Sequence, residues 1–376
     1  MINQINIIYW CFLSLVLGGS LFTSKNPSEF LEVPHKIMIK HPGEKKPVQV
    51  ILFEIQNEAG FPVQYRMDVN SVICLAQVCK VIPVTLYWSN TGQYQRYELQ
   101  KEATLEKYEA DLFETDDYVK LDAILKNDDS PFKDVYIEDI WTVPSTLSEE
   151  VDAISGATIL ELDEKDTVPG AALTCYTLWH WANGNIVSEI KNCTSISVSN
   201  EQLEVFISHR DVTYFDIALQ ALQDRNLYEA IFVDAVMNRI LKNEALLDRG
   251  FTYLEKAPIK TYLQVASVLF FKGEKLQKLA AMRSLLEVDT KVSVAYLEEW
   301  TEVISTLGTF QEVSALLDLI EKKDIDSEEV NTSVTPLLQS EFLIARRAYW
   351  FLYKQRLNPS QIKVIKAFQK KYKARL

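Results

Sequence analysis

The sequence predicts an α+β domain with an antiparallel sheet, followed by an all-α domain of α-solenoid-like helical hairpins. Residues 25–200 contain short runs of alternating apolar and polar residues, bounded by turn residues, and only one or two helical patterns. From Gln202 onward, apolar residues instead recur at spacings of three and four with short breaks, which is typical of stacked hairpins. A chain of 376 residues is long enough to give both domains a core.

Residues 1–24 are expected to be a signal peptide or a single N-terminal anchor. The run from Ile7 to Phe22 is almost uninterrupted apolar sequence, and small residues stand at positions 18–20, where cleavage is expected. As a helix this run would be about 24 Å long, slightly short of the roughly 30 Å hydrocarbon core of a bilayer. This length is compatible both with a cleaved signal peptide and with a retained anchor. We expect an exported, periplasmic protein, associated with the membrane if this segment is retained.

The first half of the α+β domain is predicted to consist of strands. Residues 25–50 are expected to form an entry loop with a short strand. Further strands are predicted at 48–55, 72–74, 84–88 and 94–99. The turn residues Ser89-Asn90-Thr91-Gly92 separate the last two strands and predict a hairpin, whose aromatic side chains would pack one face of the sheet.

The second half of this domain is predicted to contain two helices and two strands. Apolar spacing predicts a helix at 116–126 and a strand at 136–143. A second helix is expected to open at Thr167-Val168-Pro169, because proline fits the first helical turn and Thr167 can cap it. This helix would end at Asn183-Gly184, and a strand is predicted at 185–198.

The helical domain is expected to span residues 201–376. Its breaks are predicted at residues 224–226, 249–250, 257–258, 272–273, 307–308 and 322–324. Stacked hairpins most often present a surface to a partner protein. The alternative is a plain helical bundle that only supports the first domain.

Charge is distributed unevenly along the chain. The net charge of −13 argues against nucleic acid as a partner. Residues 98–166 contain 21 acidic and 6 basic residues, whereas residues 342–376 contain 10 basic residues and no acidic one. This basic tail would meet anionic lipid headgroups, an acidic partner or the acidic part of its own chain. The alternative is a solvated amphipathic helix whose apolar stripe packs inward.

The most informative motif is D-A-I-S-G-A-T, at residues 152–158. It places the Thr158 hydroxyl at the end of a run of small side chains, where a bulky phosphorylated molecule can approach it. The motif resembles the flavin-attachment motif of the FMN-binding domain family, found in the C subunit of sodium-translocating NADH:quinone oxidoreductases and the Rnf complex G subunit. Five residues match it in register: Asp152, Ser155, Gly156, Ala157 and Thr158. The family pattern commonly continues with a hydroxyl residue, whereas Ile159 follows here.

The resemblance implies that a flavin transferase joins FMN covalently to Thr158 through the FMN phosphate. The other four matching residues would form the recognition site for that enzyme and then the phosphate pocket. The protein would be an electron-transfer module rather than a stand-alone catalyst, working with a redox partner protein or a membrane complex. Aromatic rings stack well on isoalloxazine, and Tyr176 with Trp179 offers such a surface. The alternative is a tight Ser-Gly turn in which Thr158 merely starts the next element.

Four cysteines follow the N-terminal segment, and an even number in an exported chain predicts disulfides. We expect Cys74 and Cys79 to close a short hairpin, and Cys175 and Cys193 to tie a helix to a strand, although four cysteines permit three pairings. The alternative is a redox-active dithiol of Cys74 and Cys79. The four histidines lack the spacing of a zinc pair, so no metal site is predicted.

Two further functional hypotheses compete with the flavoprotein. The first is a non-redox periplasmic scaffold that binds another protein through the helical stack. The second is a disulfide reductase that uses Cys74 and Cys79.

Overall fold

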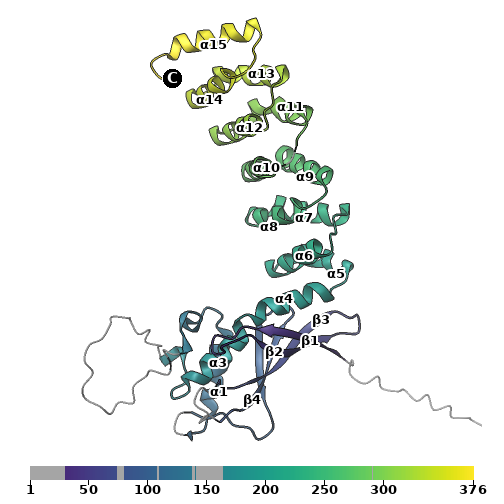
Figure 1. Ribbon diagram of the computed structural model, residues 1–376, viewed down its shortest axis with the longest axis vertical. Coiled ribbons are helices and arrows are strands. Elements are labelled where there is room, and N and C mark those ends of the chain that lie inside the picture. The colour runs from purple at the N-terminus through teal and green to yellow at the C-terminus, as the bar shows by residue number, and fades with distance from the viewer. Residues whose placement is uncertain (1–29, 74–79, 108–109, 138–139, 141–163, 290) are drawn as a thin grey trace, which may run out of the picture.

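The computed structural model describes residues 30–73, 80–107, 110–137, 140, 164–289 and 291–376. Its N-terminal domain is built on a five-stranded antiparallel sheet in which each strand pairs with the next along the chain (Figure 1). The strands are β1 (Leu31–Ile39), β2 (Val48–Gln56), β3 (Pro62–Asn70), β4 (Pro83–Ser89) and β5 (Tyr94–Leu99). This order is the simplest for strands joined by short connections.

One face of the sheet is buried beneath helices. Side chains alternate across a strand, so residues such as Tyr65 and Met67 in β3, and Leu86 and Trp88 in β4, point to the same buried face. Three helices cover that face: α1 (Thr115–Lys126), α3 (Ala172–Asn183) and α4 (Ile186–Ser197). Two short 3-10 helices, η2 (Pro131–Asp134) and η3 (Glu164–Asp166), also belong to the described part of this domain.

The predicted β4–β5 hairpin and the predicted first helix are confirmed. The hairpin turn contains Gly92, whose φ of +83° favours glycine, and a Cβ there would lie 2.9 Å from Val187 Cγ1 on α4. The turn therefore docks directly against α4. The helix predicted at 116–126 is α1.

Several predicted elements of this domain are wrong. The strand predicted at 185–198 is α4, because its buried residues Ile186, Ile190 and Cys193 follow helical spacing. Residues 136–143 were predicted to form a strand, but two of the described residues in this range, Ile137 and Ile140, are helical. The helix predicted to open at Thr167 begins at Ala172, after a turn at Val168–Ala171 in which Gly170 has a φ of +72°. Strand β3 was not predicted. A strand was expected at 72–74 instead, but Val72 and Ile73 follow the end of β3 at Asn70 and are not part of a strand.

The second domain is a stack of helical hairpins, as the sequence predicts (Figure 1). Its α-helices are α5 (Asn200–Ser208), α6 (Val212–Asp224), α7 (Ala230–Lys242), α8 (Leu247–Leu254), α9 (Ile259–Lys272), α10 (Lys275–Glu287), α11 (Val294–Glu302), α12 (Phe310–Lys322), α13 (Glu328–Val334), α14 (Phe342–Leu352) and α15 (Pro359–Tyr372). The 3-10 helices η4 (Glu244–Leu246), η5 (Ile304–Thr306) and η6 (Thr335–Gln339) lie between them. From α5 to α14, odd-numbered helices form one layer and even-numbered helices the other, and α15 closes the far end.

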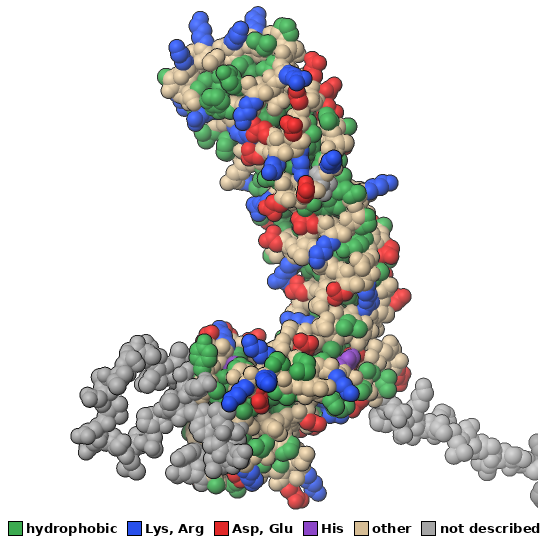
Figure 2. Space-filling model, viewed as in Figure 1, with side chains coloured by type: hydrophobic (Ala, Val, Ile, Leu, Met, Phe, Trp, Pro, Cys, Tyr) green, Lys and Arg blue, Asp and Glu red, His purple; other side chains and the backbone are tan. Residues whose placement is uncertain are grey.

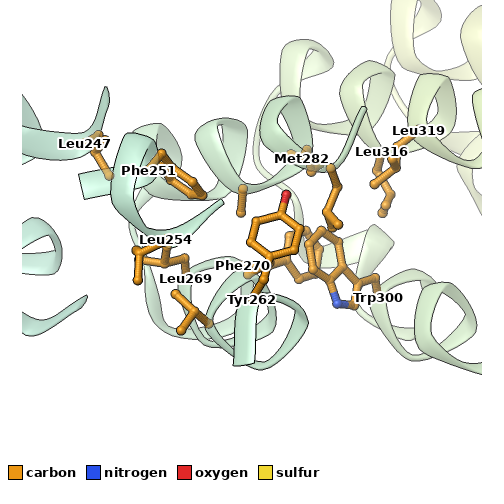
Figure 3. Close-up of a cluster of buried hydrophobic side chains, with 14 of the residues drawn as sticks. Leu247, Phe251, Leu254, Tyr262, Leu269, Phe270, Met282, Trp300, Leu316 and Leu319 are labelled. Carbon is orange, nitrogen blue, oxygen red and sulfur yellow. The ribbon is translucent and has the colours of Figure 1, made fainter. Parts of the chain in front are cut away.

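A continuous apolar core runs along this stack (Figure 3). Phe270 of α9 and Trp300 of α11 lie nearly parallel, with ring centroids 4.1 Å apart and an interplanar angle of 4°. The indole Nε1 of Trp300 donates to Ser267 Oγ at 3.2 Å. Each hairpin thus shares its core with the next, which makes the stack a one-dimensional array.

Two of the predicted breaks are Schellman-type helix ends. Asn226 and Asp324 follow α6 and α12 with a φ of 54° each. The Leu227 N–H donates to the Leu222 carbonyl at 2.9 Å, and the Ile325 N–H donates to the Ile320 carbonyl at 3.2 Å, which is the bond that defines this motif. The break predicted at 249–250 is wrong.

Gly250 lies inside α8 rather than at a break. A Cβ at this position would lie 2.5 Å from Ile240 Cγ2, so the glycine allows α8 to approach α7 closely. A glycine needed for close packing and a glycine that ends a helix give the same sequence pattern.

The two domains have separate cores that meet at α4. The core of the first domain reaches Cys193, and the core of the stack begins at Val198. The Tyr214 hydroxyl on α6 donates to Asn90 Oδ1 in the β4–β5 turn at 2.8 Å, which joins the two domains. In the part of the chain that the structure covers, no helix has the length and apolar character needed to cross a bilayer.

Candidate functional site

The motif residues Asp152, Ser155, Gly156, Ala157 and Thr158 lie outside the described residues, as do Cys74 and Cys79. The described residues that were expected to contact a flavin both belong to α3.

Tyr176 and Trp179, the residues expected to stack on a flavin, are both buried in α3. Tyr176 has no exposed surface, and its ring centroid lies 6.0 Å from that of Phe132 and 4.3 Å from that of His180. Trp179 is 3% exposed, and its Nε1 donates to the Asn127 carbonyl at 2.8 Å. A flavin ring would have to displace these contacts to stack on either side chain. Because α3 is apolar on nearly every face, it is buried on nearly every face.

A cavity of about 110 Å³ lies at the surface of the same domain, between α1, η2 and η3. It is lined by Lys120, Ala123, Ile124, Asn127, Ser130, Lys165 and Asp166. Small-molecule pockets usually measure roughly 300–1,000 Å³, so this cavity is too small to hold the three fused rings of FMN. Its two lysines and one aspartate suit water or a small ion better.

The structure brings together two histidines that are far apart in the sequence. The rings of His41 and His180 lie 5.7 Å apart, and the ring of His41 lies 4.6 Å from that of Trp181. His41 Nδ1 accepts the Gly43 N–H at 3.0 Å, so its Nε2 carries the proton and donates to the Thr177 carbonyl at 3.0 Å. The spacing of the histidines in the sequence does not predict this pair, because His41 lies in a loop and His180 lies on helix α3.

Burial keeps both histidines neutral. It lowers the pKa of His41 to about 4, and the pKa of His180 is also lowered to about 4, by burial and by the neighbouring His41. Within the described part of the chain, His180 Nε2 and Trp181 Nε1 are buried without a hydrogen-bond partner. Because unsatisfied buried groups are rare, an ordered water is the simplest partner for them. The described residues contain no cluster of three metal-ligating side chains.

A second polar cluster surrounds Glu54, a fully buried carboxylate on β2. Its Oε2 lies 2.8 Å from His35 Nε2 and accepts hydrogen bonds from the hydroxyls of Tyr65 at 3.1 Å and Ser197 at 2.7 Å. Its Oε1 accepts from Gln56 Nε2 at 2.6 Å. Burial raises the pKa of Tyr65. Since both carboxylate oxygens are satisfied, we assign this cluster a structural role where the sheet meets the end of α4.

The disulfide expected between Cys175 and Cys193 is not formed. Both residues are free and buried, and Cys193 lies on helix α4 rather than on the predicted strand. Burial raises the pKa of each thiol to about 12. Neither thiol is therefore suited to redox chemistry, which requires an accessible thiolate.

The helical stack carries a repeated feature on its surface. Exposed apolar residues stand at the first or second position of three successive odd-numbered helices: Ile231 of α7, Ile259 of α9 and Val294 of α11. The even-numbered helices repeat this pattern with Leu276 of α10, Phe310 of α12 and Leu343 of α14. The starts of the odd-numbered helices follow one another along the stack, as do the starts of the even-numbered helices, so each set of residues follows one edge of the stack as a row. We call them the odd row and the even row.

Comparison with protein-family models, with curated proteins and with solved structures finds no match to this chain.

Proposed function

We propose that this protein is a scaffold that binds an elongated segment of another protein along its helical stack. The observation that carries this proposal is the recurrence of exposed apolar side chains at equivalent positions of successive helices. A single exposed apolar residue on a surface is ordinary. A row that repeats with the hairpins is different, because it offers evenly spaced contacts to an extended partner.

The arrangement of the hairpins supports the same proposal. The two helices of a hairpin run in opposite directions, so the starts of odd-numbered and even-numbered helices lie at opposite edges of the stack. The odd and even rows would thus be separate binding edges rather than one patch. The two rows are about equally exposed: the side chains of Ile231, Ile259 and Val294 are 44–53% exposed, and those of the even row are 41–61% exposed.

The test replaces one row at a time with aspartate. The variant I231D/I259D/V294D places charges in the odd row, and L276D/F310D/L343D does the same in the even row. Aspartate at the start of a helix interacts favourably with the helix dipole, so both variants should keep their fold. Proteins that co-purify with the wild-type chain are identified by mass spectrometry and measured again with each variant. We expect one partner to be lost with one of the two variants and kept with the other, because the rows lie at different edges of the stack. If both variants retain every co-purifying protein, the proposal is wrong.

A second candidate function is covalent flavin binding, favoured by the motif of residues 152–158. Under this proposal Thr158 carries FMN, a flavin transferase attaches it, and an exported protein exchanges electrons with a redox partner in the periplasm. A covalent bond would prevent the loss of the cofactor outside the cell. The surrounding described residues add no support, since Tyr176 and Trp179 are buried and the cavity is small.

Mass spectrometry tests the flavin proposal directly. The chain is produced together with a flavin transferase, and the peptide containing Thr158 should gain the mass of FMN less one water. The Thr158→Val variant, which keeps the side-chain shape but lacks the hydroxyl, should show no gain and no fluorescence in a denaturing gel. An unmodified wild-type peptide would exclude this function without affecting the scaffold proposal.

A further inference from the structure

The helix that closes the stack, α15, carries a stripe of lysines. Lys363, Lys366 and Lys370 of α15 and its C-cap residue Lys373 follow one another at spacings of three, four and three residues, which places them on one side of the helix. All four are exposed. None of them forms an ion pair or a hydrogen bond with any residue of the described chain. We call this set the lysine stripe.

The opposite side of α15 is already occupied. Ile365 and Phe368 are buried against the stack, and the Phe368 ring lies 5.5 Å from the ring of Tyr349 on α14. The helix is therefore fixed with its apolar side inward and its lysine stripe outward. Figure 2 shows the resulting gathering of Lys and Arg side chains at the tip of the stack.

The stripe is not explained by the stability of the helix. Like charges three or four residues apart destabilise a helix by roughly 0.2–0.5 kcal/mol per pair. Some other basic residues near this end are paired, such as Arg347 with Asp318 at 2.8 Å and Lys354 with Glu321 at 3.2 Å. No such carboxylate accompanies the four lysines of the stripe in the described part of the chain.

The acidic residues of helix α1 lie too far from the stripe to neutralise it. Helix α1, in the acidic region, lies at the opposite end of the molecule from α15, with the whole stack between them (Figure 1). The partner must therefore come from outside the chain. Its surface must be anionic, because charge is the main feature that the stripe presents.

We propose that the lysine stripe docks this end of the stack onto an anionic lipid bilayer. Clusters of four to eight Lys or Arg residues on an amphipathic helix are a common means of binding anionic lipids. Protein–protein interfaces are instead depleted in Lys and enriched in Arg, whereas the stripe contains lysine alone. Two exposed aromatic residues of the adjacent α14 segment, Trp350 and Tyr353, suit the headgroup region, where such rings are enriched.

Because the apolar side of α15 is occupied, binding would be electrostatic, without insertion of the helix. The acidic domain at the other end would be repelled by the same surface. The molecule would therefore stand with α15 against the headgroups and the sheet domain away from them.

The experiment measures binding of the full chain to vesicles of phosphatidylcholine alone and of phosphatidylcholine mixed with phosphatidylglycerol. Any binding through the apolar N-terminal run would appear with both kinds of vesicle. The stripe should add binding only to the anionic ones, and ~0.15 M salt should weaken it. Equal binding to both kinds would overturn the proposal.

The variant K363Q/K366Q/K370Q/K373Q removes the stripe and retains good helix formers. It should bind anionic vesicles on the order of a thousandfold more weakly. The matched control, K36Q/K40Q/K45Q/K46Q, removes four exposed lysines from the sheet domain and should bind like the wild type. Equal losses in both variants would mean that only net charge matters.

Circular dichroism of the stripe variant verifies that its helices are intact. The remaining alternative is an acidic polypeptide as the true partner. If the full chain binds soluble polyglutamate through the stripe but does not bind anionic vesicles more strongly than neutral ones, the stripe is a protein-binding surface and the lipid proposal is wrong.

Discussion

The Ser197 hydroxyl, on the last residue of α4, donates a 2.7 Å hydrogen bond to the buried Glu54 carboxylate on β2. This bond lies where the sheet ends and the helical stack begins. The core of the sheet domain ends at Cys193 and the core of the stack begins at Val198, so Ser197 lies at the boundary between the two cores. The junction between the sheet and the stack thus contains a buried carboxyl group whose hydrogen bonds link β2 to the end of α4.

Ser197→Ala should destabilise the protein by about 1–3 kcal/mol, because Glu54 loses one of its donors without access to water. The matched control is Ser208→Ala, which also removes a hydroxyl from the last residue of a helix but at an exposed position. The control should cost less than about 0.5 kcal/mol. Urea unfolding of both variants measures the difference. Equal midpoints would contradict the structural role assigned to the Glu54 cluster.

Stability should fall as the pH drops through the range set by His41 and His180. Both have a pKa lowered from 6.5 to about 4, so between these values the unfolded chain binds protons that the folded chain does not. The free energy of unfolding is therefore unaffected by these rings above about pH 6.5. It falls progressively toward pH 4, by on the order of 3 kcal/mol for each ring.

The measurement is the free energy of unfolding between pH 7 and pH 5, where few carboxylates titrate. His180→Phe keeps an aromatic ring but cannot take up a proton, so it should reduce the pH dependence markedly. An unchanged slope in this variant would show that His180 does not titrate as described.

Gly92→Ala and Gly60→Ala separate backbone strain from a steric clash. Both glycines have a positive φ, +83° and +69°, but only a Cβ at residue 92 meets a neighbour, Val187. Gly60→Ala should cost about 1–2 kcal/mol from strain alone. Gly92→Ala should cost clearly more, because the β4–β5 turn must also move away from α4. Thermal and urea unfolding would reveal this order, and a reversed order would contradict the docking of the turn.

Cys175 and Cys193 should resist thiol reagents in the native protein. Both thiols are buried and have a pKa near 12, so little thiolate is available at neutral pH. Peptide mass spectrometry after alkylation should find both residues unmodified in buffer and both modified in denaturant without a reducing agent. If either requires reduction before it can be alkylated, a disulfide is present and the assignment of free thiols fails.

The parts of the fold that the sequence predicted are those with strong local patterns. The β4–β5 hairpin has turn residues between alternating runs, and the breaks at 224–226 and 322–324 end in residues that tolerate a left-handed backbone. Helix α4 was mistaken for a strand because Ile, Val and Thr favour strands locally, whereas tertiary packing decides the outcome. Gly250 was mistaken for a break because the residues next to a glycine do not show whether it ends a helix or allows a second helix to pack closely.

The candidate site was harder to predict than the fold. Tyr176 and Trp179 have the right spacing to share a helix face, but spacing does not tell whether that face meets a ligand or a core. The His41–His180 pair and the Glu54 cluster unite residues from distant segments, so no window of sequence contains them. The lysine stripe was visible as a basic tail, but its outward orientation depends on how α15 packs.

The position of α15 also bears on the length of the assembly. Stacked hairpins are open-ended in principle, since the apolar edge of the last hairpin can accept another copy and so produce a filament. Here α15 packs its apolar side onto the hairpin before it and turns the lysine stripe outward. A second copy that stacked onto α15 would therefore have to cover charged side chains instead of an open apolar edge, which disfavours growth of a filament from this helix.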